Sequence, residues 1–322
     1  MTTRSQKPIK EYILPFLDYC EIEKGLSNNT QKNYNQYLNL FSNWLRKSGK
    51  GNLSPIQLTM KDIWDYRLYL ARKYKTPRGG YLSKRSQNYY LIALRCLLDY
   101  FTDKDITCIP SSKIKLAKER NDNQITFLEW PDLKKIFSIP DTASFAGLRD
   151  RAILEMFFST GMRISELVSL DKDSVGPLLE KNITRTLELS IVGKGKRVRT
   201  VYISPRAGQW IKKYLLARAN KIIKPLFINI HSKNPDAQRL SPRSIQIMIS
   251  RYAKLAGIFK KVTPHTLRHS YATDLLAHGA DLRSVQEFLG HKNVATTQIY
   301  THMTNKRLRD IHEKFHAANI DS

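Results

Sequence analysis

The chain has 322 residues, of which 41% are hydrophobic, and Lys and Arg outnumber Asp and Glu by 54 to 28, a formal net charge of +26. This length predicts about two domains, and the hydrophobic content excludes a disordered chain. No apolar stretch reaches the ~20 residues of a membrane-spanning helix, and residues 1–10 lack the apolar core of a secretion signal. Cys20, Cys96 and Cys108 have neither metal-ligand nor disulfide-framework spacing, so we expect a cytoplasmic protein with reduced thiols and no membrane contact.

The positive charge is distributed over the whole chain. Residues 1–110 contain 18 Lys or Arg against 9 Asp or Glu, and residues 126–322 contain 32 against 17. Because each neutralised phosphate releases counterions, two basic segments favour a protein that holds nucleic acid from two sides. A basic but otherwise ordinary soluble protein is the alternative.

Apolar residues spaced three and four apart predict helices around residues 34–45, 63–74 and 90–101. Ser27 or Asn28 can cap the first of these helices and Ser83 the third. The cations on their outer faces are candidates for DNA contact: Lys32, Lys84, Arg85 and Arg95. Lys84 and Arg85 lie in a first helical turn, where free N–H groups also attract phosphate. For any single cation, a solvated surface charge is the alternative.

The helical periodicity fails between residues 102 and 124, which predicts a linker. We therefore expect a helical domain at 1–105, a linker at 106–124 and a second domain at 125–322. In the second domain, apolar residues alternate before and after the turn-like residues 193–196, which predicts a β-hairpin. Helices are expected over 149–159 and 162–170, and again from about residues 206, 241, 264, 281, 295 and 305. The fold class is mainly α with a small β-hairpin.

Four motifs contain polar residues of the types that take part in catalysis, and each motif alone is weak evidence for a function. They are Thr160–Leu167 with Arg163 and Glu166, Gly193–Lys196, the HTLRH segment 265–269, and Gly290-His291 followed by Tyr300. HTLRH has two histidines at zinc spacing but no acidic residue or cysteine cluster nearby. Arg163 and Glu166 can form a purely structural ion pair. The glycine-lysine turn lacks the P-loop spacing and the Ser/Thr.

Together these motifs resemble the tyrosine recombinase (phage integrase) family, and within it the Xer-type recombinases. The resemblance covers nearly the whole chain and rests on Met162–Leu167, His265-x-x-Arg268, Leu289–His291 and Tyr300 in family order. It implies a core-binding domain and a catalytic domain that close on duplex DNA as a C-shaped clamp. It also implies a hairpin lysine, which we assign to Lys194 with Lys196 as the alternative, because residues 175–186 are longer than usual for the family.

These residue types suffice for phosphodiester transfer. Tyr300 supplies the nucleophilic oxygen, and the planar guanidiniums of Arg163 and Arg268 hold the nonbridging oxygens. His265 accepts the tyrosyl proton, His291 donates a hydrogen bond to the phosphate, and Lys194 protonates the departing 5′ oxygen. Glu166 orients Arg163. Since the sequence has no dense cluster of acidic residues for Mg²⁺, we expect neither a metal nor another cofactor.

The predicted function is site-specific recombination through a 3′-phosphotyrosine, in the Xer manner of chromosome or plasmid dimer resolution. The alternatives are integration of a mobile element, a catalytically silent DNA-binding homologue, and a relaxing topoisomerase. The resemblance implies a tetramer on two DNA sites, joined by a C-terminal helix that carries Leu308, Ile311 and Phe315. A second related recombinase and a DNA translocase are further candidate partners.

Overall fold

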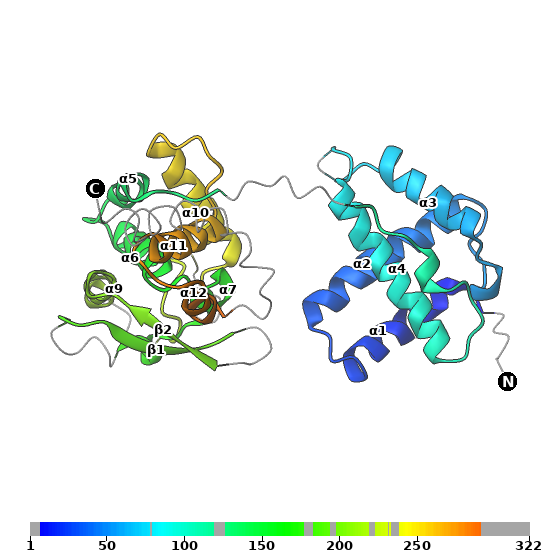
Figure 1. Ribbon diagram of the computed structural model, residues 1–322, viewed down its shortest axis with the longest axis horizontal. Coiled ribbons are helices and arrows are strands. Elements are labelled where there is room, and N and C mark those ends of the chain that lie inside the picture. Colours follow the sequence, from blue (N-terminus) through cyan, green and yellow to red (C-terminus); the bar gives the residue numbers. More distant parts are fainter. Residues whose placement is uncertain are drawn as a thin grey trace, which may run out of the picture. The chain divides into compact units, whose positions relative to one another are not determined.

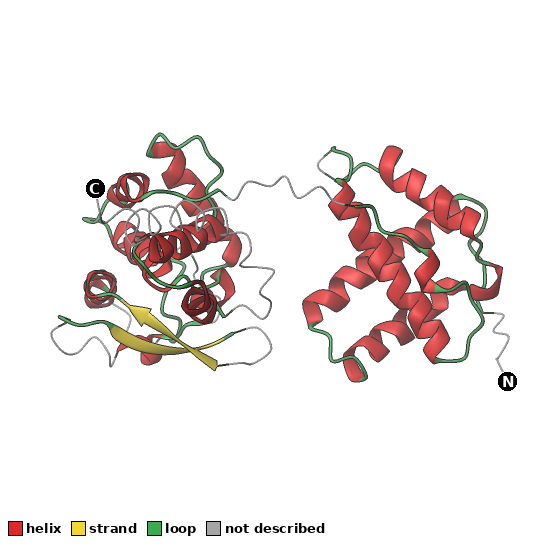
Figure 2. Ribbon diagram, in the orientation of Figure 1, coloured by secondary structure: helices red, strands yellow, loops and turns green. Residues whose placement is uncertain are grey.

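A computed structural model describes residues 7–77, 79–118, 126–176, 183–193, 198–218, 223–230, 232 and 238–290. The chain divides into two compact units, residues 1–122 and 123–322, both visible in Figure 1. Helices dominate both units, and one strand pair lies in the second (Figure 2). Within the described ranges, the search for a helix long and apolar enough to cross a bilayer gives none.

The first unit is built from four α-helices and three short 3₁₀ segments among its described residues. They are η1 (Ile9–Tyr12), α1 (Ile13–Ile22), α2 (Asn28–Lys47), η2 (Pro55–Gln57), α3 (Met60–Arg72), α4 (Lys84–Asp103) and η3 (Ser111–Lys113). The hydroxyls of Ser27 and Ser83 accept the backbone N–H groups of Thr30 and Ser86, so both expected caps are confirmed. Helices α1, α2 and α4 pack against one another around a core rich in aromatic rings.

Residues 106–118 lie against this first unit, although they fall in the segment expected as a linker. Ile114 is buried, and the Asn88 side chain both donates to the Ala117 carbonyl and accepts the Ala117 N–H, each at 3.0 Å. Arg67 donates to the Lys115 carbonyl at 2.7 Å. The side chains of α3 and α4 thus bind the backbone of this segment, and such contacts leave no hydrophobic period in its sequence.

The second unit surrounds one buried helix, α6 (Phe145–Thr160). Its other described elements are α5 (Trp130–Ser138), α7 (Ile164–Ser169), α8 (Lys172–Val175), β1 (Leu187–Val192), β2 (Val198–Ile203), α9 (Pro205–Ala217), α10 (Pro242–Leu255), α11 (Pro264–Ala277) and α12 (Leu282–Leu289). Helix α6 packs against α9, α11, α5 and β2, and residues 152–154, 156 and 157 are fully buried. It is therefore the central helix of the unit, and its charged side chains pair with one another, Arg149 with Asp150 and Arg151 with Glu155.

The two strands form the expected antiparallel hairpin, with Leu187 opposite Ile203 and Val192 opposite Val198. Leu189 and Ile191 are buried on β1, while Val201 and Ile203 are buried on β2, so one face of the pair covers the core. The mainly α fold with a small hairpin is confirmed. The helices expected from residues 295 and 305 lie outside the described residues.

Candidate active site

Gly161 sets the path of the chain into the site. Helix α6 ends at Thr160, and Gly161 has φ 58°, the left-handed conformation that glycine adopts without strain. A Cβ atom there would lie 2.2 Å from Cδ1 of Tyr271, so only glycine fits. Burial raises the pKa of Tyr271 to about 12, even beside the positive charges of Arg268 and Arg199. This buried ring packs directly against the turn at Gly161.

The tight turn places Arg163 at the N-cap of α7. Its backbone N–H donates to Oε2 of Glu166 at 2.7 Å, and its Nη1 donates to Oε1 of the same carboxylate at 3.0 Å. The spacing of three residues therefore brings arginine and carboxylate together, as the sequence suggested. The Glu166 side chain is buried, with 4% of the residue exposed.

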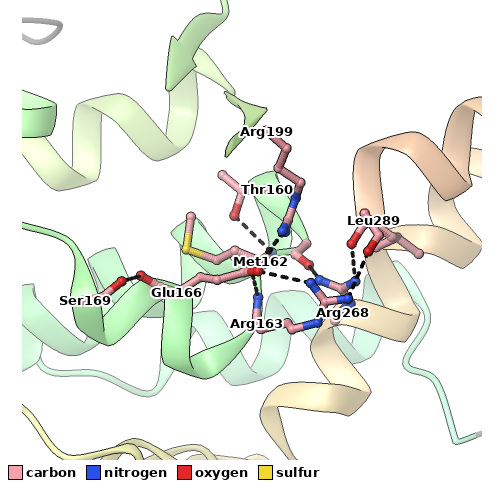
Figure 3. A network of polar contacts seen from close by, with 10 residues as sticks. Thr160, Met162, Arg163, Glu166, Ser169, Arg199, Arg268 and Leu289 are labelled. Atoms are coloured by element: carbon pink, nitrogen blue, oxygen red, sulfur yellow. Dashed lines mark hydrogen bonds and ion pairs between the residues drawn. The ribbon is translucent and has the colours of Figure 1, made fainter. Parts of the chain in front are cut away.

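Arg199 of β2 is the second arginine on Glu166. Its Nη1 and Nη2 donate to Oε1 at 2.6 Å and Oε2 at 2.8 Å, as Figure 3 shows. Burial alone would raise the pKa of Glu166, but the bonds from Arg199 and from the amide and guanidinium of Arg163 outweigh it and lower that pKa. Glu166 is thus a carboxylate anion at neutral pH.

Arg268 lies on α11, whose first turn is fixed by the Thr263 cap and by Pro264. The residue is 5% exposed, and its Nη1 donates to the Gly161 carbonyl at 2.7 Å while its Nη2 donates to the Leu289 carbonyl. Arg163 reaches the next carbonyl, that of Gly290, with its Nη2 at 3.1 Å. The two arginines therefore hold consecutive carbonyls at the end of α12 (Figure 3).

His265 is an exposed residue in the first turn of α11. Partial desolvation, followed by the positive charges of Arg268 and Arg163, lowers its pKa below the usual value. His269, one helical turn later, has a lowered pKa for the same kinds of reason, with His265 itself among the causes. A neutral imidazole is the form that accepts a proton, so desolvation, together with the two arginines, favours the form that the predicted role of His265 as a base requires.

The described residues contain only part of the predicted set. Arg163, Glu166 and Arg268 lie together, and both arginines influence the pKa of His265. The other predicted catalytic residues lie outside the described residues: Lys194 with its alternative Lys196, His291 and Tyr300. The DNA-contact candidates belong to the first unit, where Lys32 on α2 and Lys84 and Arg85 on α4 are exposed, and Arg95 is half-buried.

Sequence reasoning did not find Arg199, which lies 33 residues from its carboxylate and has no motif around it. On β2 the inward-facing residues Val201 and Ile203 are apolar, and Arg199 occupies the next inward-facing position. A charged residue at such a position is the one signal in the sequence that could have marked it. Three guanidiniums and one carboxylate give this cluster a surplus of positive charge, which suits a phosphate. A group of three or more His, Cys, Asp or Glu able to hold a metal ion is not found within the described part of the chain.

Comparison with known proteins finds a matching family model for each part of the chain. The phage integrase family matches residues 126–307, and the phage integrase N-terminal SAM-like domain matches residues 13–105. The chain is 36% identical over 310 residues to tyrosine recombinase XerD of Listeria monocytogenes serotype 4b (strain F2365), covering 96% of this chain and 99% of that protein.

Solved structures share the fold. XerH site-specific recombinase bound to its difH substrate in a pre-cleavage complex has a TM-score of 0.72 at 22% identity, covering 96% of this chain and 97% of that one. A lambda integrase tetramer bound to a Holliday junction has a TM-score of 0.64 at 15% identity, covering 92% and 78%. Because the family match spans more than half of the chain and the XerD relative aligns over nearly all of it, the chain belongs to the phage integrase family as a Xer-type site-specific tyrosine recombinase, an enzyme that cuts and rejoins DNA.

Proposed function

We propose that this recombinase resolves chromosome or plasmid dimers at a specific duplex site, in the cytoplasm. The observation that carries the assignment of chemistry is the cluster in which Arg163 and Arg268 converge on the carbonyls of residues 289 and 290. The role in dimer resolution is supported by the XerD relative, which aligns over 99% of its own length. Integration of a mobile element is the alternative with the same chemistry.

Catalysis by this site requires the two guanidiniums to hold the nonbridging oxygens of the scissile phosphate. Each guanidinium has five N–H donors, so bonds to carbonyls and bonds to phosphate can coexist on one side chain. The carbonyl bonds orient the arginines before substrate arrives, and such preorganised donors stabilise the extra charge of a pentacovalent phosphorane. Arg163 and Arg268 therefore serve as the electrostatic catalysts.

The remaining roles follow the order of bond changes. The Tyr300 oxygen forms a bond to phosphorus while the bond from phosphorus to the 5′ oxygen breaks. His265 takes the tyrosyl proton, Lys194 gives a proton to the 5′ oxygen, and His291 donates a hydrogen bond to the phosphate. Rejoining reverses these steps and needs no nucleotide, because the phosphotyrosine conserves the bond energy.

The first unit is proposed as the core-binding domain, which the match of residues 13–105 to the SAM-like domain supports. Lys32, Lys84, Arg85 and Arg95 are its candidate phosphate contacts. The lambda integrase relative is a tetramer on a Holliday junction, which supports assembly of this chain into a tetramer on two sites. The segment after Tyr300 is proposed to join the subunits, and a second related recombinase or a DNA translocase is a further proposed partner.

A nicked suicide duplex tests the proposed chemistry. We expect a covalent protein–DNA adduct that forms in excess EDTA without nucleotide and that Tyr300→Phe abolishes. Failure to form an adduct on any duplex that the protein binds specifically would favour the catalytically silent homologue. An adduct with a strict requirement for Mg²⁺ in the chemical step would refute the proposed role of the arginines.

A further inference from the structure

The guanidinium of Arg199 makes more bonds to Glu166 than the guanidinium of Arg163 does. The Arg199 guanidinium donates to both carboxylate oxygens of Glu166, at 2.6 and 2.8 Å, whereas the Arg163 guanidinium donates one hydrogen bond to Glu166, at 3.0 Å. The Arg199 side chain is 14% exposed and that of Arg163 is 29% exposed. Bidentate pairs of this kind are the strongest that arginine forms with a carboxylate. Arg199 and the backbone N–H of Arg163 together therefore fix the orientation of Glu166.

This arrangement determines what Arg163 can do. A buried carboxylate needs a positive partner, and removing its main partner leaves an uncompensated charge. Without Arg199, Glu166 would draw the Arg163 guanidinium into its own bidentate pair and away from the Gly290 carbonyl that Arg163 now reaches. With Arg199 in place, Arg163 stays partly exposed and retains donors for an incoming anion.

Arg199 also contacts a second part of the site. A Cβ atom at Gly290 would lie 3.0 Å from Cδ of Arg199 and 3.3 Å from its Nε and Nη1. The guanidinium thus passes directly over the residue whose carbonyl accepts from Arg163. One side chain therefore joins strand β2, the start of α7 and the end of α12.

We propose that Arg199 is a positioning residue for recombination, which neutralises Glu166 so that Arg163 remains available to the scissile phosphate. This inference rests on the proposed role of Arg163. It gives the hairpin a role besides carrying the proposed catalytic lysine of its turn: Arg199 on strand β2 keeps Arg163 available to bind the phosphate. Among the described residues, Arg199 bonds Glu166 and lies against Gly290, so its loss should slow cleavage while the affinity for duplex DNA stays the same.

The test compares Arg199→Met, Arg199→Lys, and each combined with Glu166→Gln in the full-length protein. Single-turnover cleavage of the nicked duplex should fall at least tenfold in Arg199→Met and less in Arg199→Lys, with the Kd for the duplex unchanged. Glu166→Gln should restore part of the rate in both backgrounds, because a neutral amide no longer captures Arg163. A merely structural role would lower the free energy of unfolding together with the rate, because the loss of Arg199 leaves Glu166 unpaired in that case too. Urea unfolding of each variant is therefore measured beside cleavage, and a rate that falls only in proportion to the loss of folded protein would overturn the positioning role.

Arg206→Lys is the matched control, because Arg206 also shares a buried carboxylate, Glu155, with another arginine, Arg151. It should leave the cleavage rate within about twofold of the unmodified protein. A wild-type cleavage rate in Arg199→Met overturns the proposal, and so does a double variant that cleaves no faster than its parent. If Arg199→Met fails to fold, Arg199→Lys with and without Glu166→Gln provides the same comparison. Arg163→Lys is assayed in parallel to separate failure of this proposal from failure of the proposed function. A wild-type cleavage rate in Arg163→Lys would show that Arg163 takes no part in the chemistry.

Discussion

The two site arginines differ in how much of each guanidinium the protein already uses. Arg268 is buried and both of its Nη atoms donate to backbone carbonyls, so its plane is fixed from two directions. Arg163 is more exposed and is held by one side-chain bond to Glu166 and one bond to Gly290. In the proposed phosphate site, Arg268 is therefore the rigid arginine and Arg163 the adaptable one.

Lysine at either position should retain DNA binding but lose cleavage. Arg163→Lys and Arg268→Lys keep the positive charge, yet an ammonium cannot grip two phosphate oxygens with a planar fork. We expect single-turnover cleavage to fall by roughly 100-fold or more, as for loss of one preorganised transition-state donor. Filter binding on the same duplex provides the control, and a variant that cleaves normally would exclude its arginine from the site.

The pKa of His265 should lie below its ordinary value of 6.5 in the free protein. A lowered pKa keeps the ring neutral to lower pH, so the base form is lost only as the pH falls through that lowered value. Arg163→Gln removes one of the positive charges that lower it and should shift the pKa upward. An NMR titration of the imidazole measures both values, and an unchanged pKa in the variant would contradict the electrostatic coupling.

At the scale of elements, the ends of helices were predictable and their distant contacts were not. The caps Ser27, Ser83 and Asp281 each bond an N–H three residues ahead, a local contact that sequence specifies. The hairpin was equally predictable, because apolar residues alternate along both of its strands. The contact of Arg199 with Glu166 depends on how β2 packs beside α7, which no local pattern encodes.

Gly161→Ala should destabilise the second unit by about 3 kcal/mol, from a left-handed backbone combined with overpacking against Tyr271. Gly25→Ala is the matched control, because Gly25 has the same φ of 58° but no atom within 4 Å of an added Cβ. Its cost should be about 1 kcal/mol. Urea unfolding of the two variants measures the difference, and equal effects would show that the ring contact is unimportant.

For the whole molecule, the basic charge of both units predicts DNA binding that weakens steeply with salt. Lys84→Ala and Lys32→Ala should each reduce the slope of log K against log salt by about 1, as expected for one phosphate contact. Lys104→Ala is the control, because Lys104 already pairs with Glu23 at 2.7 Å. Equal slopes for all three variants would remove the two helix cations from the DNA interface.

Assembly provides the second test at this scale. Deleting residues 304–322, which lie outside the described residues, should leave single-site binding intact and abolish synapsis and recombination. The narrow apolar spacing of Leu308, Ile311 and Phe315 fits a terminal helix packed on its own subunit equally well, and the family resemblance is what favours its transfer to a neighbouring subunit. Gel shifts on one site and recombination between two sites measure both properties, and full recombination by the truncated protein would refute the coupling.

The hydrogen bonds of the arginine cluster span long stretches of sequence, with separations of 33, 107 and 127 residues. A nascent chain emerging from the ribosome can complete its first unit early, because the core of that unit is formed entirely within residues 1–122. The cluster closes only after residue 290 emerges, roughly 6–25 s after Arg163 at ordinary rates of synthesis. A chain cut short between these points therefore contains the first unit, the proposed core-binding domain, without the assembled arginine cluster.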